Sequence, residues 1–269
     1  MGAGIAQVAI LHGLETTLYD LDAASLQNGR NSISKNLTEA VAKGKISAAA
    51  QSDAIGRLRC TQDMSACVAD MILEAIVEKT EPKISLLLQL AAINSRNTIL
   101  ASNTSSLSVT GIASRLPLPE RVIGMHFFNP APRMPLVEII RTPFTSQPTL
   151  EATQALARRL GKTAVCCRDS PGFIVNRVAR PYYLEALRLL EEGLTDIETI
   201  DGLMEASGFR MGPFRLMDLI GNDVNYAVSC SLYEALGKPE RLKPAAIQAQ
   251  KVQDGHLGRK RGQGYYRYP

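Results

Sequence analysis

A candidate acid–base centre lies in the segment Met125–Pro130, which reads Met-His-Phe-Phe-Asn-Pro and is followed by Glu138 twelve positions after His126. An imidazole has an unperturbed pKa of about 6.5, and a partner carboxylate fixes its tautomer and stabilises the imidazolium. A histidine backed in this way can take a proton from an alcohol near neutral pH. The alternative is that His126 is a buried histidine at a strand end whose hydrogen bonds are satisfied.

Glu138 lies within a run of apolar residues that is typical of a strand. Side chains alternate between the two faces of a strand, so Leu136 and Ile140 share the face of Glu138. A carboxylate among apolar neighbours needs a partner, because burying an unpaired charge is costly. This pattern favours a paired carboxylate over the alternative of a solvent-facing strand residue.

The composition is that of an ordinary globular protein, with 45% hydrophobic and 21% charged residues among 269. No apolar run approaches the roughly 18 residues that a membrane span needs, and no signal peptide is visible. The net charge of +4 suits an anionic small molecule better than nucleic acid. The five cysteines include no Cys-x-x-Cys pair, so we expect no disulfide framework, no bound metal and a cytoplasmic location.

The first twenty residues match the second half of a dinucleotide-binding βαβ unit, since a helical apolar pattern over residues 5–11 precedes a short strand that ends in Asp20. Gly2 fits the last glycine of G-x-G-x-x-G, where close helix–strand packing excludes a side chain. Asp20 lies where an acid hydrogen-bonds the adenosine ribose. No arginine follows it, which favours NAD over NADP. An ordinary helix–strand pair is the alternative.

The strand that should precede this helix, and the first two glycines of the motif, are missing from the chain. A doubly wound sheet places that strand near its centre. Without it, neighbouring strands leave unpaired backbone groups, each costing roughly 1–3 kcal/mol when buried. We therefore expect the natural protein to have residues upstream of Met1.

Strands and helices alternate up to about residue 169, and only helices follow. We therefore predict an α/β fold: a Rossmann-like, doubly wound, mostly parallel sheet over residues 1–169, without its first strand, and an all-helical domain over residues 170–269. A helical hairpin is expected at about residues 23–56. Further strands are predicted at residues 58–61, 70–76, 98–102, 121–128, 136–141 and 162–168, and helices at residues 81–94, 147–160, 171–192, 195–207, 213–236 and 243–254.

Several ordered motifs resemble the L-3-hydroxyacyl-CoA dehydrogenase family, and together they cover essentially the whole chain. The resemblance implies oxidation of a 3-hydroxyacyl-CoA to the 3-ketoacyl-CoA by NAD, in a homodimer formed through the helical domain. The matching segments are residues 70–78, 101–106, 126–132 and 170–177, and residues 258–266 match the family's C-terminal signature.

Within the family, residues 178–183, 208–214 and 218–226 are most similar to the bacterial branch of phenylacetate catabolism. That similarity implies 3-hydroxyadipyl-CoA as the substrate, with 3-hydroxybutyryl-CoA as the alternative. The free carboxylate of an adipyl chain needs a cationic partner or access to solvent, and Arg180 and Arg210 are candidates for the cation. The incomplete glycine loop leaves a further alternative, a binding relative that has lost catalysis.

The resemblance also implies roles for individual residues. His126 is the base that removes the 3-hydroxyl proton, worth roughly 10²–10⁴ in rate, and Glu138 holds the imidazole. Ser105 and Asn176 position the substrate oxygen and thioester; their alternative roles are a helix cap and a surface amide. The implied cofactor contacts are Gly2, Asp20, Glu78, Lys83, Asn103, Asn129 and Lys260.

Overall fold

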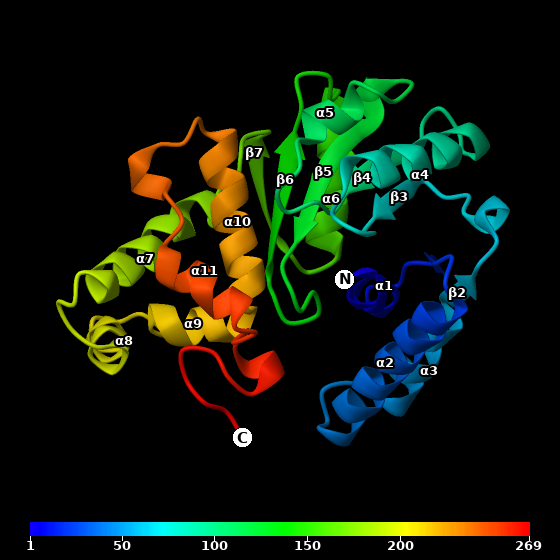
Figure 1. The fold of residues 1–269 in the computed structure, drawn as a ribbon. Helices are drawn as coiled ribbons and strands as arrows, with labels where there is room; N and C mark the ends of the chain where they lie inside the picture. The colour runs from blue at the N-terminus through cyan, green and yellow to red at the C-terminus, as the bar shows by residue number, and fades with distance from the viewer. The chain divides into compact units, whose positions relative to one another are not determined.

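The computed structural model describes all 269 residues and divides into two compact units, residues 1–169 and residues 170–269. We call them the N-terminal unit and the helical unit. Figure 1 shows strands and helices in the first and helices alone in the second. The predicted fold class, an α/β domain followed by an all-helical domain, is confirmed. None of the helices combines the length and apolar character that a membrane crossing requires.

The N-terminal unit follows the predicted alternation closely, with one additional short helix, α5. Turns of 3-10 helix occur at Met64–Ala66 and Pro119–Arg121. The elements are α1 (Gly2–Leu11), β1 (Thr16–Tyr19), α2 (Ala23–Ala42), α3 (Ala48–Gly56), β2 (Leu58–Thr61), β3 (Met71–Glu74), α4 (Thr80–Ile93), β4 (Ile99–Ser102), α5 (Val109–Ala113), β5 (Val122–Phe127), β6 (Leu136–Arg141), α6 (Gln147–Arg159) and β7 (Thr163–Arg168).

The strands form two sheets rather than one. β1 and β2 pair in parallel, and the other five strands form a sheet in the order β3-β4-β5-β6-β7. All neighbours in the larger sheet are parallel except β5 and β6, which are antiparallel. α1 begins beside both sheets, because a Cβ on Gly2 would lie 3.9 Å from Leu18 of β1 and 4.0 Å from Ala75, which directly follows β3.

Helices cover both faces of the five-stranded sheet. On one face, Ile5 of α1 and Leu150 of α6 pack with Met125 of β5. On the other face, residues of α4 and α5 such as Leu87 and Ile112 pack against β4. Fully burying one such side chain contributes about 1.5–3 kcal/mol, so these two layers stabilise the sheet.

The predicted hairpin is present as α2 and α3, with Gly44 in the left-handed conformation (φ 65°) between them. Asp22 caps α2 by accepting hydrogen bonds from the backbone amides of Ala24 and Ser25. Only two side chains of α2, Ile33 and Leu37, are buried. They pack with α1 and α3, so the hairpin is anchored on α1 by a narrow apolar stripe.

The helical unit corrects one prediction. The single helix expected over residues 213–236 is wrong, because Gly221 has a φ of 104° that a right-handed helix cannot contain. It separates α9 from α10. The elements are α7 (Val175–Glu191), α8 (Ile197–Ala206), α9 (Pro213–Ile220), α10 (Asn222–Ala235) and α11 (Ala246–Gln253), with short turns of 3-10 helix at Glu240–Leu242 and Arg259–Arg261.

Candidate active site

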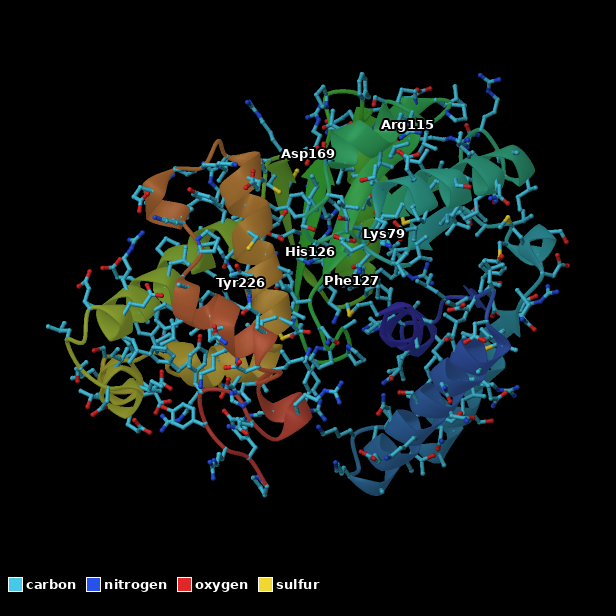
Figure 2. The ribbon with its side chains drawn as sticks, in the orientation of Figure 1. Lys79, Arg115, His126, Phe127, Asp169 and Tyr226 are labelled. Carbon is cyan, nitrogen blue, oxygen red and sulfur yellow. The ribbon has the colours of Figure 1, made fainter.

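His126 and Glu138 face each other across the antiparallel pair of β5 and β6. They are direct partners in the register of the two strands, and His126 Nδ1 lies 2.8 Å from Glu138 Oε2. Both are buried, at 5% and 1% exposure. Figure 2 shows His126 beside Phe127 at the end of β5. The chain reverses direction between β5 and β6, and this brings together two residues that are twelve positions apart.

The geometry of this pair fixes which nitrogen of His126 carries the proton. An ionised carboxylate can only accept hydrogen bonds, so Nδ1 donates to Glu138 and Nε2 is the nitrogen that can take up a proton. The ring of Phe128 lies 4.5 Å from the imidazole, centre to centre, and covers one side of it. On β7, burial and the charge of Glu138 raise the pKa of Cys167 to about 11, so this thiol stays neutral near the carboxylate.

Asn103 connects the end of β4 to the strand of the histidine. The side-chain Oδ1 of Asn103 accepts a hydrogen bond of 2.8 Å from the backbone amide of Phe127. The backbone amide of Asn103 donates to the carbonyl of Glu74 at 2.8 Å. The resemblance implies that Asn103 contacts the cofactor. Its oxygen is used internally, so Nδ2 is the group that it can offer to a ligand.

Glu78 organises the loop that follows Asn103. Its Oε1 accepts from Thr104 Oγ1 at 2.6 Å, from the Ser105 amide at 2.8 Å and from the Ser106 amide at 3.1 Å. Burial alone would raise the pKa of Glu78, but the hydrogen bond from Thr104 and the charge of Lys83 outweigh it and hold that pKa below its ordinary value. Glu78 is therefore a carboxylate whose hydrogen bonds shape the backbone around Ser105.

Lys83 is buried rather than solvated, at 1% exposure. Its Nζ donates to Glu74 Oε1 at 2.7 Å and to the Ile76 carbonyl at 3.4 Å, and it lies 3.2 Å from Glu78 Oε2. An ammonium has three donors, so these three acceptors use all of them. The direct cofactor contact implied for Lys83 remains a prediction, whereas the contacts seen are internal.

Glu74 is not among the residues that the sequence predicts for the site. It is the last residue of β3, is 3% exposed and accepts hydrogen bonds from Lys83, the Ile76 amide and Ser102 Oγ. The signal that could have found it is the one that singled out Glu138, an acid inside an apolar strand. Such an acid needs a partner, and here the partner is a lysine nine positions further on.

The N-terminal cofactor residues lie around β1. Asp20 directly follows that strand, is exposed, and accepts a hydrogen bond from the Asp22 amide at 3.0 Å. A side chain at Gly2 would meet its neighbours only at ordinary van der Waals distance. The expectation that close packing excludes a side chain there is therefore wrong for this structure. Space is tighter at Gly4, where a Cβ added to the glycine would lie 3.3 Å from Pro132.

The remaining predicted residues lie in three places. Asn129 is exposed and directly follows Phe128 in the chain, and the peptide bond between Asn129 and Pro130 is cis. Asn176 is the second residue of α7, in the helical unit. Lys260 also belongs to the helical unit, where its Nζ lies 2.6 Å from Asp223. The structure thus brings together six predicted site residues that lie on the strands of the larger sheet or in the loops and helix that follow them, namely Glu78, Lys83, Asn103, Ser105, His126 and Glu138.

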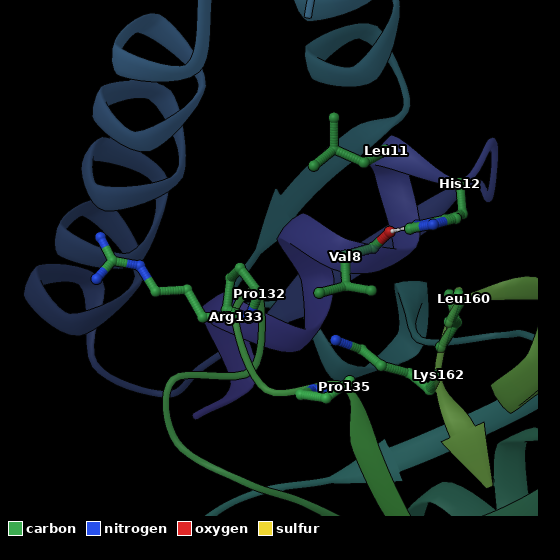
Figure 3. A pocket seen from close by; sticks show the side chains of 9 residues that line it. Val8, Leu11, His12, Pro132, Arg133, Pro135, Leu160 and Lys162 are labelled. Atoms are coloured by element: carbon green, nitrogen blue, oxygen red, sulfur yellow. Dashed lines mark hydrogen bonds between the residues drawn. The ribbon is translucent and has the colours of Figure 1, made fainter. Parts of the chain in front are cut away.

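A cavity of about 280 Å³ lies elsewhere in the N-terminal unit and contains none of the predicted site residues (Figure 3). His12 Nδ1 donates to the Val8 carbonyl at 2.8 Å, and Lys162 Nζ donates to two carbonyls of the β5–β6 loop. Figure 3 shows Arg133 pointing away from Lys162. The basic side chains of this cavity therefore do not converge on a common ligand. Its lining is Val8, Leu11, His12, Pro132, Arg133, Pro135, Leu160, Gly161 and Lys162.

Comparison with known proteins assigns both units. Residues 1–170 match the family "3-hydroxyacyl-CoA dehydrogenase, NAD binding domain", and residues 172–268 match "3-hydroxyacyl-CoA dehydrogenase, C-terminal domain". The chain is 45% identical over 268 residues to the 3-hydroxyadipyl-CoA dehydrogenase of Escherichia coli, covering 99% of this chain and 56% of that protein. It is 40% identical to a probable 3-hydroxybutyryl-CoA dehydrogenase of Deinococcus radiodurans, covering all of this chain and 96% of that one.

Solved structures give the same result. The 3-hydroxybutyryl-CoA dehydrogenase of Escherichia coli K12 superposes with a TM-score of 0.97 at 44% identity, covering 100% of this chain and 57% of that chain. The (S)-3-hydroxybutyryl-CoA dehydrogenase of Ralstonia eutropha has a TM-score of 0.96 at 38% identity, covering 100% of this chain and 95% of that chain. This chain therefore spans little more than half of each Escherichia coli match and nearly all of the Deinococcus and Ralstonia relatives.

An NAD-binding α/β unit followed by a helical unit is the arrangement that the two matching family models describe, and the buried pair of His126 and Glu138 lies in the first of these units. The chain belongs to the 3-hydroxyacyl-CoA dehydrogenase family. The predicted family and the predicted cofactor, NAD, are both confirmed at this level.

Proposed function

We propose that this protein oxidises the hydroxyl of a (3S)-3-hydroxyacyl-CoA to the ketone, with His126 as the base. The hydrogen bond of 2.8 Å between His126 Nδ1 and Glu138 carries the proposal. It directs Nε2 to take the hydroxyl proton, and the buried carboxylate of Glu138 stabilises the imidazolium that results. When bound, NAD supplies the acceptor for the hydride that leaves C3.

The residues present fit NAD. Asp20 is an exposed carboxylate directly after β1, as a contact to the ribose hydroxyls requires. α1 begins at Gly2 without a side-chain cap, so its first amides can meet a pyrophosphate. Asn103 offers Nδ2, and Asn129 is exposed next to the histidine segment. We assign the remaining contacts to Glu78, to Lys260 and, through its charge from beneath the loop, to Lys83.

We assign substrate positioning to Ser105 and Asn176, and propose 3-hydroxyadipyl-CoA as the substrate. The 45% identity to the Escherichia coli protein of that name supports this assignment. The alternative substrate is 3-hydroxybutyryl-CoA, which the names of the Deinococcus and Ralstonia relatives support over nearly their whole length.

The two candidate arginines for the adipyl carboxylate differ sharply. Arg180 is 3% exposed and donates to the carbonyls of Asn176 and Asn225 and to Ser229 Oγ. Burial lowers its pKa to about 10, and its Nε and Nη1 donate to groups within the helical unit. Arg210 is exposed, so it is the better candidate for a substrate carboxylate.

Arg210→Ala tests the substrate proposal. We expect its activity on 3-hydroxyadipyl-CoA to fall about tenfold or more relative to 3-hydroxybutyryl-CoA, because a charge-assisted hydrogen bond is lost only for the dicarboxylate. Initial rates with the two thioesters measure this ratio. A ratio equal to that of the wild type would remove Arg210 from the account.

We further propose a homodimer that forms through the helical unit. The family resemblance is the ground for this proposal, and the helical unit has large exposed apolar side chains that a second copy could cover. Sedimentation should give twice the chain mass, and a monomer would contradict the proposal. The side chains, each 47–72% exposed, are Val178, Leu194, Leu203, Phe209, Leu219 and Val224.

The cysteines support a cytoplasmic location, which we also propose. All five are free, as is usual in a reducing compartment. Recovery of the protein from a membrane or secreted fraction would contradict this location.

Turnover is the direct test of the proposed function. NADH binding is followed by fluorescence, and acetoacetyl-CoA reduction by the NADH absorbance. We expect His126→Gln to abolish turnover while leaving NADH affinity unchanged, because only the base is removed. Saturable NADH binding without turnover in the wild type would instead support a relative that has lost catalysis.

A further inference from the structure

A chain of charged groups, buried at its inner end, supports the loop of residues 103–106 that contains Ser105. Lys83 lies at its centre and bridges Glu74, at 2.7 Å from Nζ to Oε1, and Glu78, at 3.2 Å from Nζ to Oε2. The side chains of Lys83 and Glu74 are 1% and 0% exposed. An unpaired buried charge is costly, so each of these two groups requires the other.

The outer end of the chain holds the backbone of the loop. Glu78 Oε1 accepts from the amides of Ser105 and Ser106, at 2.8 and 3.1 Å, and from Thr104 Oγ1 at 2.6 Å. Hydrogen bonds to an ionised acceptor are about twice as strong as neutral ones. The conformation of the loop therefore depends on both the position and the charge of Glu78.

The inner end determines that position. Glu74 binds Lys83, which in turn binds Glu78, and Glu74 Oε2 also accepts from Ser102 Oγ at 2.7 Å. The carbonyl of Glu74 accepts from the Asn103 amide at 2.8 Å, at the start of the loop. Glu74 thus reaches the loop from two directions, although it is buried beneath it.

We propose that Glu74 is a positioning residue for the reaction: acting through Lys83, it holds Glu78 so that the loop presents Ser105 to the substrate. The inference rests on the proposed function, in which Ser105 contacts the substrate. Without the charge of Glu74, Lys83 is drawn wholly to Glu78. That shift weakens the hydrogen bonds from Glu78 to the loop amides.

Glu74→Gln tests the proposal, since it keeps the shape and the Oε1 acceptor but removes the charge. The matched control is Glu81→Gln, which removes an exposed carboxylate that pairs with Arg115 on the surface. Two readouts are followed: hydrogen exchange of the Ser105 and Ser106 amides, and kcat/KM for acetoacetyl-CoA. We expect Glu74→Gln to speed exchange and to lower kcat/KM, each by roughly tenfold. The control should change neither.

A second variant separates positioning from simple charge balance. In Glu74→Gln/Lys83→Met neither buried charge remains, so a residue that only neutralised Lys83 is no longer needed. Wild-type exchange and kcat/KM in this double variant would overturn the proposal. So would unchanged exchange in Glu74→Gln. The proposal predicts that the double variant stays impaired, because Glu78 has lost its tether.

The double variant also carries the test should the single variant not fold, since it leaves no lone charge on Lys83. The exchange readout is independent of catalysis. If the wild type turns over no acyl-CoA thioester, the proposed function fails, while hydrogen exchange at Ser105 and Ser106 still decides whether Glu74 positions the loop.

Discussion

Glu138 in the N-terminal unit and Asp218 in the helical unit are equally buried, at 1% exposure, but contact different groups. Glu138 binds an imidazole. Asp218 accepts from the amides of Tyr265 and Tyr266, each at 2.9 Å, and further from Asn222 Nδ2 and Tyr268 Oη. The partner of Glu138 is an imidazole, which can either gain or donate a proton, whereas the donors to Asp218 are neutral amides and a hydroxyl.

The difference shows what marks a carboxylate for chemistry. Burial and the nearby Asp218 raise the pKa of Tyr268 to about 12, so the hydroxyl that donates to Asp218 keeps its proton at any working pH. Asp218 therefore holds the C-terminal tail in one arrangement. The imidazole beside Glu138 can instead change its protonation during a reaction. Burial alone does not identify a catalytic acid, whereas the chemistry of its partner does.

The largest expected effect comes from Glu138→Gln. The amide keeps the hydrogen-bonding shape but no longer stabilises the imidazolium, so kcat should fall about 10²-fold or more, within the roughly 10²–10⁴ that such a base contributes. NADH absorbance under saturating substrate measures the effect. A kcat close to that of the wild type would contradict a catalytic role for Glu138 and leave it, like Asp218, a structural carboxylate.

Asp218→Ala should act on stability instead. It leaves several buried donors of the tail without an acceptor, each costing roughly 1–3 kcal/mol, so we expect a loss of about 3 kcal/mol or more. Urea unfolding measures this loss. The kcat of the remaining folded protein should change little, and a large fall in kcat without destabilisation would contradict the structural role.

The smallest effect concerns Glu78 and acid. Its folded pKa lies below the unfolded value of about 4.3, so its ionised form stabilises the fold above that pH. This contribution is lost as the pH falls through the folded pKa. Between about pH 5 and pH 3, the wild type should lose more stability than Glu78→Gln. The side chain is 36% exposed, so solvent screening keeps the difference modest. If the wild type and Glu78→Gln lose stability equally as the pH falls, the charge of Glu78 does not stabilise the fold.

The pairing of His126 with Glu138 was open to prediction because two local patterns agreed. Strand periodicity placed Glu138 on an apolar face, and a buried acid needs a partner. The alternation of elements likewise predicted the α/β unit and the helices after it. Their bounds follow from residues that are close in sequence, and this is the information that a sequence displays directly.

Other features depend on contacts that no local pattern reveals. The hydrogen bond from Ser102 to Glu74 spans 28 positions and exists only because β3 and β4 are neighbours. The apolar period continues from α9 into α10, so only the backbone angle of Gly221 shows where the helix breaks. From the sequence, Lys83 is expected to face solvent at the start of its helix. Its burial depends on two carboxylates that lie outside this helix, Glu74 at the end of β3 and Glu78 in the loop after it, and helical periodicity does not reveal such partners.

The tautomer of His126 tests the central claim most directly. ¹⁵N NMR of the histidine side chains at pH 8 distinguishes a proton on Nδ1 from one on Nε2. The account predicts Nδ1–H for His126 in the wild type, with Nε2 as the acceptor, and a changed population of tautomers in Glu138→Gln. A wild-type His126 that carries its proton on Nε2 would contradict the claim that Glu138 prepares this ring to act as a base.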